Sequence, residues 1–272
     1  MKEFGKHYAT VLRKIRRARA LVLLLDFDGT LSPIVSRPEN SYLPAQTRSI
    51  LKELLRALPI CVITGRALRV IQKKADIRGL WYAASHGLEW NLGGTSSVHR
   101  VSRAALRDLA DTRAKVRRLK TKYPQLINEY KPFAVTFHYH LLPKSELKSF
   151  ARDTQALLEK IEGNPKLRMF RDKRTIDIAP SFRGEKGNAA KYVLHHLTKQ
   201  AGIRFLPIYI GDSSPDEDAF RVLKRGITIR VGKTRESAAQ YYFKSRREVP
   251  QFLRWLSTHY NRVGKVWHAR DF

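Results

Sequence analysis

The sequence predicts an α/β protein in which a parallel sheet is flanked by helices and interrupted by an inserted α+β segment. Three observations favour this fold class. Continuous apolar runs of strand length end at polar residues, segments with helical periodicity separate these runs, and the pattern changes between residues 103 and 180. A continuous apolar run is typical of a parallel strand that is covered on both faces.

The first predicted strand ends at a pair of acids. Residues 21–25 are all apolar, and Asp26 and Asp28 follow them, one residue apart. Ligands of open parallel sheets bind beyond the carboxyl ends of the strands, and Gly29 lets the chain turn sharply there. A carboxylate in this place can attack phosphorus, and two close acids suit Mg²⁺, which prefers one or two carboxylates with water and phosphate oxygens. An Asp-Gly turn between two strands would explain the glycine but not the second acid.

The next segments repeat this pattern of helix and strand. Residues 46–58 carry apolar side chains at a helical period, and residues 59–63 form an apolar strand that ends at Thr64 and Gly65. A hydroxyl and backbone N–H groups at such a strand end can hold phosphate oxygens, although Thr-Gly is also common in ordinary turns. Residues 81–84 form a third short strand.

Residues 103–180 differ from the rest of the chain. Helical periodicity at residues 106–119 is followed by alternation at residues 133–139. A second helical segment, residues 144–161, precedes two short strands between residues 167 and 178. Helices mixed with hairpin-like strands indicate an α+β insert rather than more parallel sheet.

The parallel pattern resumes after residue 180. Lys186 lies at a glycine-containing helix start, where backbone N–H groups and the helix dipole add to its charge and suit a phosphate. Residues 205–210 form the last strong strand, and Asp212 follows its end. Residues 226–232 and 249–259 supply a further strand and a C-terminal helix.

The composition is that of a globular protein. The chain has 272 residues, of which 43% are hydrophobic, enough for one elaborated domain or a core with a smaller insert. No apolar run approaches the length of a membrane span, so no membrane partner is expected. Cys61 is the single cysteine; without an intrachain disulfide, the expected location is cytoplasmic.

The formal net charge of +29 is unusual for this class of fold. Such a charge is typical of proteins that bind nucleic acid or an anionic surface. The basic residues are spread along the chain, however, and the one dense cluster, residues 13–19, lacks interleaved aromatic side chains. A basic field also attracts phosphorylated substrates, so charge alone does not choose between these interpretations.

The motifs together resemble a known family. Residues 26–31, Asp-Phe-Asp-Gly-Thr-Leu, resemble the first motif of the haloacid-dehalogenase-like (HAD) phosphohydrolases, and residues 32–35, Ser-Pro-Ile-Val, resemble the trehalose-6-phosphate phosphatases. Three later motifs follow in the same order. The resemblance implies a Rossmann-like parallel-sheet HAD core at residues 1–102 and 181–272, with an inserted α+β cap at residues 103–180 that selects the substrate.

The same resemblance implies a catalytic role for each motif. Asp26 would attack the phosphoryl group, and Asp28 would protonate the departing sugar oxygen and then activate water. Thr64 and Lys186 would hold the phosphate, with further substrate contacts from Gly65 and Arg66. The cofactor would be Mg²⁺, bound by Asp26, Asp28 and Asp212.

The cap would recognise the sugar through polar side chains. These residues fall where the family has its sugar contacts: Glu129, Lys131, His140, Lys173 and Asp177. Polar groups that bind sugar hydroxyls reject analogues sharply, because a buried group left unpaired is costly. Residues 85–89 also resemble a family motif, and the expected role of His86 in it is structural.

The chain departs from the family at four positions that bear on the site. His140 stands where the family has Arg, Asp177 where it has Glu, Ser213 where it has a second Asp, and Pro215 where it has Thr. Loss of the acid at position 213 weakens the metal site or its water shell, for which Asp216 can partly compensate. A histidine at position 140 would make sugar contact depend on pH, as an arginine would not.

The prediction from sequence is therefore a monomeric Mg²⁺-dependent trehalose-6-phosphate phosphatase whose partner is a small sugar phosphate. Two alternatives stay open at this point. One is a HAD phosphatase of another sugar phosphate, such as mannosyl-3-phosphoglycerate or sucrose phosphate. The other is a basic nucleic-acid-binding module on a phosphatase-like fold, although no sequence-specific nucleic-acid partner is expected.

Overall fold

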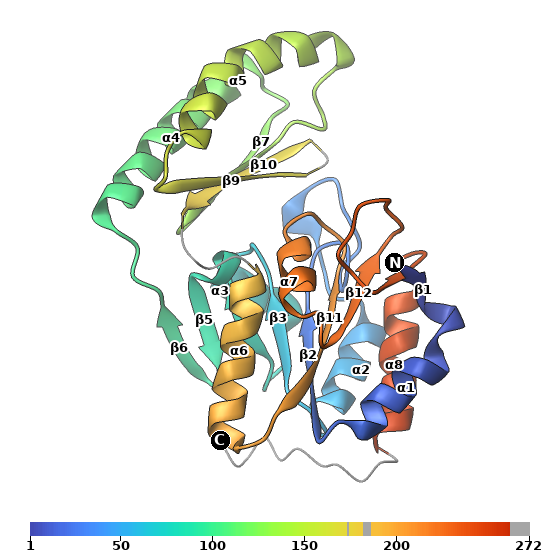
Figure 1. Cartoon of the computed structure of the whole chain (residues 1–272). Coiled ribbons are helices and arrows are strands. Elements are labelled where there is room, and N and C mark those ends of the chain that lie inside the picture. The colour runs from blue at the N-terminus through green and yellow to red at the C-terminus, as the bar shows by residue number, and fades with distance from the viewer. Residues whose placement is uncertain (173, 182–185, 262–272) are drawn as a thin grey trace. The chain divides into compact units, whose positions relative to one another are not determined.

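The computed structural model describes residues 1–172, 174–181 and 186–261 (Figure 1). Contacts between Cα atoms divide the chain into two compact units. Met1–Val98 with Gly184–Phe272 is here called the core, and His99–Arg183 is here called the insert. The segment expected to be inserted, residues 103–180, lies within the second unit. Each unit is described by itself.

The core is built on one large, mostly parallel sheet. Among the described residues its strand order is β1-β13-β12-β11-β2-β3-β4-β5-β6, and pairing is parallel from β1 to β4 and antiparallel for β5 and β6. The strands are β1 (Lys2–Glu3), β2 (Ala20–Leu25), β3 (Ile60–Ile63), β4 (Trp81–Ala84), β5 (Glu89–Leu92), β6 (Thr95–Val98), β11 (Phe205–Gly211), β12 (Ile227–Val231) and β13 (Tyr241–Phe243).

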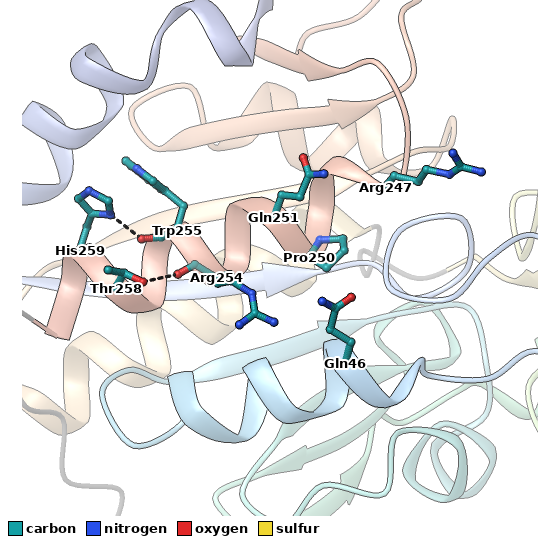
Figure 2. Close-up of a pocket in the computed structure, with 8 residues that line it drawn as sticks. All are labelled: Gln46, Arg247, Pro250, Gln251, Arg254, Trp255, Thr258 and His259. Atoms are coloured by element: carbon teal, nitrogen blue, oxygen red, sulfur yellow. Dashed lines mark hydrogen bonds between the residues drawn. The ribbon is translucent and has the colours of Figure 1, made fainter.

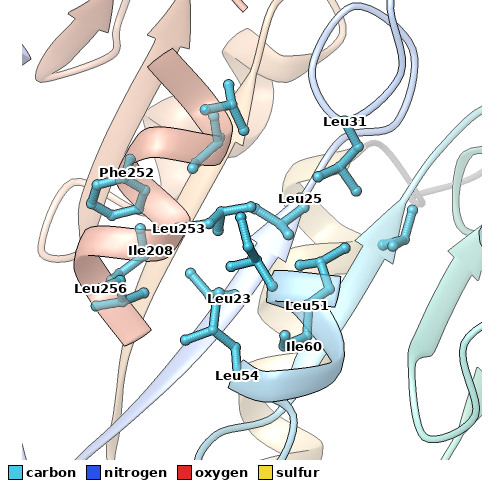
Figure 3. Packing of buried hydrophobic residues seen from close by; sticks show 14 of the residues in the cluster. Leu23, Leu25, Leu31, Leu51, Leu54, Ile60, Ile208, Phe252, Leu253 and Leu256 are labelled. Carbon is cyan, nitrogen blue, oxygen red and sulfur yellow. The ribbon is translucent and has the colours of Figure 1, made fainter. Parts of the chain in front are cut away.

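Helices cover both faces of this sheet, as the continuous apolar runs predict. Because successive side chains of a strand point to opposite faces, Leu23 and Leu25 of β2 enter one hydrophobic cluster and Val22 and Leu24 enter another. Figure 3 shows the first cluster, in which β2 packs against α2 and α8. The helices of the core are α1 (Tyr8–Arg17), α2 (Ala45–Leu54), α3 (Leu68–Ala75), α6 (Lys186–Ala201), α7 (Asp216–Val222) and α8 (Glu248–Asn261), with short 3-10 turns η1 (Phe4–Lys6), η2 (Pro38–Asn40) and η3 (Ser85–Gly87).

The burial of β2 fixes the polar residues that follow it. All six residues of the strand are buried, and full burial of a leucine side chain contributes about 1.5–3 kcal/mol. A shift of the strand by one residue would move every side chain to the opposite face. The position of Asp26 is therefore set by the packing of the five residues before it.

The insert has its own antiparallel sheet and its own hydrophobic core. The sheet order is β7-β8-β10-β9, formed by β7 (Ile127–Lys131), β8 (Ala134–His138), β9 (Leu167–Asp172) and β10 (Thr175–Pro180). The helices are α4 (Arg103–Lys122) and α5 (Leu147–Glu162), with the turn η4 (Lys144–Glu146) before α5. Val116, Phe137, Phe150 and Ile178 pack between these helices and one face of the sheet.

The α/β fold class with a parallel-sheet core is confirmed. Two local features differ from what the sequence indicates. Residues 1–19 have the pattern of one basic amphipathic helix leading into the first strand, but they form a short strand, β1, that pairs with β13, followed by η1 and α1. The antiparallel hairpin β5–β6 was not predicted, because β6 is exposed along its whole length and has a single apolar residue, Val98, too few for a strand pattern. Within the described residues, no helix has the length and apolar character needed to cross a membrane.

Candidate active site

Three polar residues lie side by side where neighbouring strands of the core end. Asp26 follows β2, Thr64 follows β3 and Asp212 follows β11, and β2 pairs with both β11 and β3. In parallel sheets these carboxyl ends share one edge, which is where such sheets bind ligands. The fold thus brings together residues that are up to 186 positions apart, since 212 − 26 = 186.

A buried lysine links two buried aspartates at this edge. The Nζ atom of Lys186 donates to Oδ1 of Asp26 at 2.6 Å and to Oδ1 of Asp216 at 2.7 Å. The side chains of Lys186 and Asp216 are 4% and 0% exposed. Buried charges are tolerated when they are paired and hydrogen-bonded, and this cluster meets both conditions.

Asp216 has more hydrogen-bond donors around it than the sequence indicated. Besides Lys186, it accepts hydrogen bonds from the Tyr209 hydroxyl at 2.7 Å and from the backbone N and Oγ of Ser213 at 2.9 and 2.7 Å. Ser213, where the family has a second Asp, is thus a donor to Asp216. We interpret Asp216 as the anchor that fixes Lys186.

The pKa values of the cluster follow from burial and from these contacts. Burial raises the pKa of Asp26, the ammonium of Lys186 opposes this, and the carboxylates of Asp216 and Asp212 add to the rise. For Asp216, burial is outweighed by Lys186 and the Ser213 donors, so its pKa is lowered. Burial alone would lower the pKa of Lys186, but the two carboxylates raise it, so the lysine stays charged.

The carboxylates fit a divalent cation. Asp26, Asp212 and Asp216 each offer an oxygen, and these oxygens lie within 4.8 Å of one another. Gly29, at φ +80°, allows the loop to approach Asp212, since a Cβ atom there would meet an Asp212 oxygen at 2.2 Å. An all-oxygen donor set of this kind suits Mg²⁺ or Mn²⁺ rather than a soft metal.

Asp28, predicted as a metal ligand, contacts Arg66 instead. Its carboxylate accepts two hydrogen bonds from this arginine, Nε to Oδ2 at 2.7 Å and Nη2 to Oδ1 at 2.8 Å. It does not belong to the group of three carboxylates formed by Asp26, Asp212 and Asp216. Arg66, expected to contact substrate, also donates to the Pro38 carbonyl at 3.1 Å. A bidentate arginine fixes the plane of a carboxylate, so Arg66 orients Asp28.

The loop after β3 accepts backbone hydrogen bonds from a strained turn that follows β4. Thr64 Oγ1 accepts from the backbone N of Arg66 at 3.2 Å, and the turn after β4 donates Ser85 N to Arg66 O and His86 N to Thr64 O. Ser85 and His86 have φ angles of 48° and 57°, a conformation that costs a non-glycine residue of order 1–3 kcal/mol and is common at functional sites. His86 thus fixes the Thr64-Gly65 loop through its backbone, in keeping with a structural role.

A second group of polar residues covers one face of the insert sheet. Thr136 Oγ1 donates to Oδ1 of Asp177 at 2.6 Å, and Lys131 Nζ lies 3.5 Å from Oδ2 of the same carboxylate. The cross-strand register places Glu129 opposite Thr136 and Thr136 opposite Asp177. Three of the residues expected to bind sugar therefore lie together on this sheet.

His138, which was not among the predicted sugar contacts, belongs to the same face. Its Nε2 lies 2.7 Å from Oε1 of Glu129, and its Nδ1 lies 3.0 Å from Oγ1 of Thr175. The His140 ring centroid is 6.0 Å from that of His138. Lys173 lies outside the described residues. The alternation of polar side chains along residues 129–138 was the signal that could have indicated His138.

The fold is that of a HAD-like hydrolase. A solved haloacid dehalogenase-like hydrolase from B. subtilis covers 86% of this chain, with 99% of that chain matched, at a TM-score of 0.59 and 16% identity. The C-terminal domain of a C. albicans trehalose-6-phosphate phosphatase covers 92% of this chain, with 96% of that chain matched, at a TM-score of 0.79 and 21% identity.

Within that class, the chain belongs to the trehalose-phosphatase family, whose model matches residues 24–249. It is 32% identical over 241 residues to a trehalose-phosphate phosphatase of Mycobacterium tuberculosis, covering 86% of this chain and 61% of that protein. It is 30% identical over 253 residues to a probable trehalose-phosphate phosphatase D of Arabidopsis thaliana, covering 88% of this chain and 68% of that protein. The chain is thus assigned to a family of phosphatase enzymes and spans about two thirds of the length of these relatives.

Proposed function

We propose that this protein is a Mg²⁺-dependent trehalose-6-phosphate phosphatase that acts through an aspartyl-phosphate on Asp26. The observation that carries the proposal is the contact of Asp26 with Lys186 at the carboxyl edge of the sheet, beside Asp212. A carboxylate, a fixed cation and a second carboxylate within reach of one metal ion are what phosphoryl transfer to an aspartate requires. Family membership favours this function over a nucleic-acid-binding module.

In the first step Asp26 attacks the phosphoryl group, and the bond from phosphorus to the sugar oxygen breaks. Lys186 offsets negative charge on Asp26 and on the phosphoryl oxygens, and Asp216 keeps the lysine in place. Asp28, oriented by Arg66, enters this step with a proton on its carboxyl group and transfers it to the departing sugar oxygen.

In the second step water hydrolyses the aspartyl-phosphate. Asp28, now ionised, takes a proton from the water as it attacks phosphorus. The Thr64 loop supplies a hydroxyl and backbone N–H groups for the phosphoryl oxygens. A bound Mg²⁺ would be held by Asp26 and Asp212, would favour the ionised form of Asp26, and would stabilise charge on the phosphoryl oxygens.

The polar face of the insert is proposed to recognise the sugar. Glu129, Lys131 and Asp177 offer both donors and acceptors, which a sugar hydroxyl needs. Thr136 and His138 hold the two carboxylates in fixed orientations. A cap role for the insert, a cytoplasmic location and a monomeric state stay predictions.

The test is phosphate release from a panel of sugar phosphates. Trehalose 6-phosphate, sucrose phosphate, mannosyl-3-phosphoglycerate and glucose 6-phosphate are compared with Mg²⁺, with excess EDTA, and with EDTA followed by Mg²⁺. We expect the highest kcat/KM for trehalose 6-phosphate, loss of activity with EDTA, and recovery with Mg²⁺. The purified Asp26→Asn variant controls for contaminating phosphatases. A higher kcat/KM for another sugar phosphate would contradict the substrate assignment, and activity that survives EDTA would contradict the metal assignment.

A further inference from the structure

An open groove lies on the core, between α2 and α8. Its volume is about 480 Å³, within the range of sites that hold small organic ligands. None of the residues that line it belongs to the active-site cluster described above. Figure 2 shows Gln46 reaching from α2 toward α8 and Arg254 reaching from α8 toward α2.

The groove carries positive charge that the described residues do not neutralise. In the part of the chain that the structure describes, Arg247 and Arg254 line the groove and no acidic side chain does. Neither guanidinium forms an ion pair with a carboxylate of these described residues. Two nearby acids are engaged elsewhere: Glu248 accepts from the backbone N of Lys244, and Glu53 accepts from Ser257. Unpaired guanidinium groups in a groove favour an anionic ligand, phosphate above all.

The remaining side chains favour a ligand that also has hydroxyl groups. The hydroxyl of Thr258 donates to the Arg254 carbonyl at 3.1 Å, which leaves its oxygen as an acceptor. His259 Nδ1 lies 2.8 Å from the Trp255 carbonyl, so a neutral ring carries its proton on Nδ1 and presents Nε2 as a second acceptor. Phosphate oxygens only accept hydrogen bonds, so these acceptors need hydroxyl donors on the same ligand.

An aromatic ring completes the lining. Trp255 is half-buried and is held by Tyr8, Phe252 and His259, with ring centroids 5.0, 5.7 and 4.9 Å away. A fixed ring beside amides and a guanidinium is suited to a ligand with one apolar face and several polar edges. A sugar ring has this character, and a simple anion does not.

We propose that the groove between α2 and α8 is a binding site for a phosphorylated sugar, separate from the catalytic site. Arg254 and Gln46 bind the phosphate, Thr258 and His259 accept from sugar hydroxyls, and Trp255 packs against the sugar ring. Arg247 adds positive charge at the start of α8.

The experiment measures ligand binding through the fluorine resonance of labelled Trp255. The full chain, labelled with 5-fluorotryptophan, is titrated with glucose 6-phosphate at a constant ionic strength of about 0.15 M, which screens non-specific attraction. The Trp255 resonance is assigned with Trp255→Phe. We expect a saturable shift of that resonance with a Kd below about 5 mM, weak binding on the usual scale of affinities. Glucose and inorganic phosphate are the two comparison ligands, and each should bind at least tenfold more weakly.

Matched variants separate the groove from the net charge of the protein. Arg254→Gln should raise the Kd about tenfold, the effect of losing one charged hydrogen bond of about 1.4 kcal/mol. Arg204→Gln removes the same charge from an exposed position outside the groove and should leave the Kd unchanged. Both variants should keep the wild-type kcat for phosphate release.

Three outcomes would overturn the proposal. They are no shift of the Trp255 resonance, an equal Kd for wild type and Arg254→Gln, and an equal Kd for inorganic phosphate and glucose 6-phosphate. The last outcome would reduce the groove to a non-specific anion site. None of them bears on catalysis, which the phosphate-release assay tests independently.

Discussion

The cluster at the sheet edge of the core and the polar face of the insert are both made of acids and bases, but they are built differently. In the core, Lys186 and Asp216 are 4% and 0% exposed, and the lysine contacts two carboxylates at 2.6 and 2.7 Å. In the insert, Glu129 keeps 25% of its side chain exposed, and Lys131 and Asp177, which are 12% and 13% exposed, lie 3.5 Å apart.

The difference indicates what each region does. Buried charges that are fully paired form a rigid, preorganised group, because any movement would leave a charge without solvation. Partly exposed polar groups exchange partners at low cost, since water replaces what is lost. The core cluster is suited to chemistry on a group of fixed geometry, and the insert face to recognition of hydroxyls. The predictions below test this contrast.

The largest effect is expected at Asp26. Asp26→Asn should abolish turnover, with kcat reduced by about 1,000-fold or more, because an amide cannot attack phosphorus. The fold should be kept, as shown by circular dichroism and a cooperative unfolding transition. Substantial phosphatase activity in well-folded Asp26→Asn protein would refute the nucleophile assignment.

The next effect concerns the stability of the core cluster. Asp216→Asn leaves Lys186 with one carboxylate instead of two and should lower the free energy of unfolding by about 3–5 kcal/mol, the usual cost of breaking a buried ion pair. Asp218→Asn on the same helix is the control. In its pair with Arg221, the arginine is 60% exposed and Asp218 itself 19%, so the change should stay within about 1 kcal/mol. Urea unfolding in EDTA measures the free energy of unfolding of both variants. An equal decrease in the two would contradict the contrast between buried and exposed pairs.

A smaller effect, on binding rather than on turnover, is expected in the insert. Glu129→Gln should raise the KM for trehalose 6-phosphate about tenfold, from the loss of a charged hydrogen-bond acceptor, while kcat stays within about twofold. Glu159→Gln makes the same chemical change on the exposed face of α5, where Glu159 contacts Gln155, and should leave both constants unaltered. A fall in kcat with unchanged KM would assign Glu129 to catalysis instead.

The smallest effect is expected at His140. His140→Ala removes a ring nitrogen that can hydrogen-bond a sugar hydroxyl, so the KM for trehalose 6-phosphate should rise about fivefold, the effect of losing one neutral hydrogen bond of about 1 kcal/mol. The kcat should stay unchanged. An unaltered KM in His140→Ala would show that His140 is not a sugar contact.

Local sequence determined the elements that position the site. The apolar runs of β2, β3 and β11 and the polar residues after them identified the sheet edge, because burial on both faces leaves a continuous apolar signal. The resemblance of the motifs to a known family then implied that Asp26, Thr64, Lys186 and Asp212 share a site. These features depend on residues that are adjacent in the chain.

Tertiary structure decided how those side chains are paired. Lys186 contacts Asp26 across 160 positions and Asp216 across 30, and Arg66 reaches back 38 positions to Asp28. Sequence periodicity contains no information about such partners, so Asp216 was expected only to compensate at the metal site and Arg66 to contact substrate. The same holds for β1, whose pairing with β13 joins residues 239 positions apart, since 241 − 2 = 239. A sequence specifies which groups reach the sheet edge, but their partners are set by the folded chain, in which each buried charge must find its counter-charge.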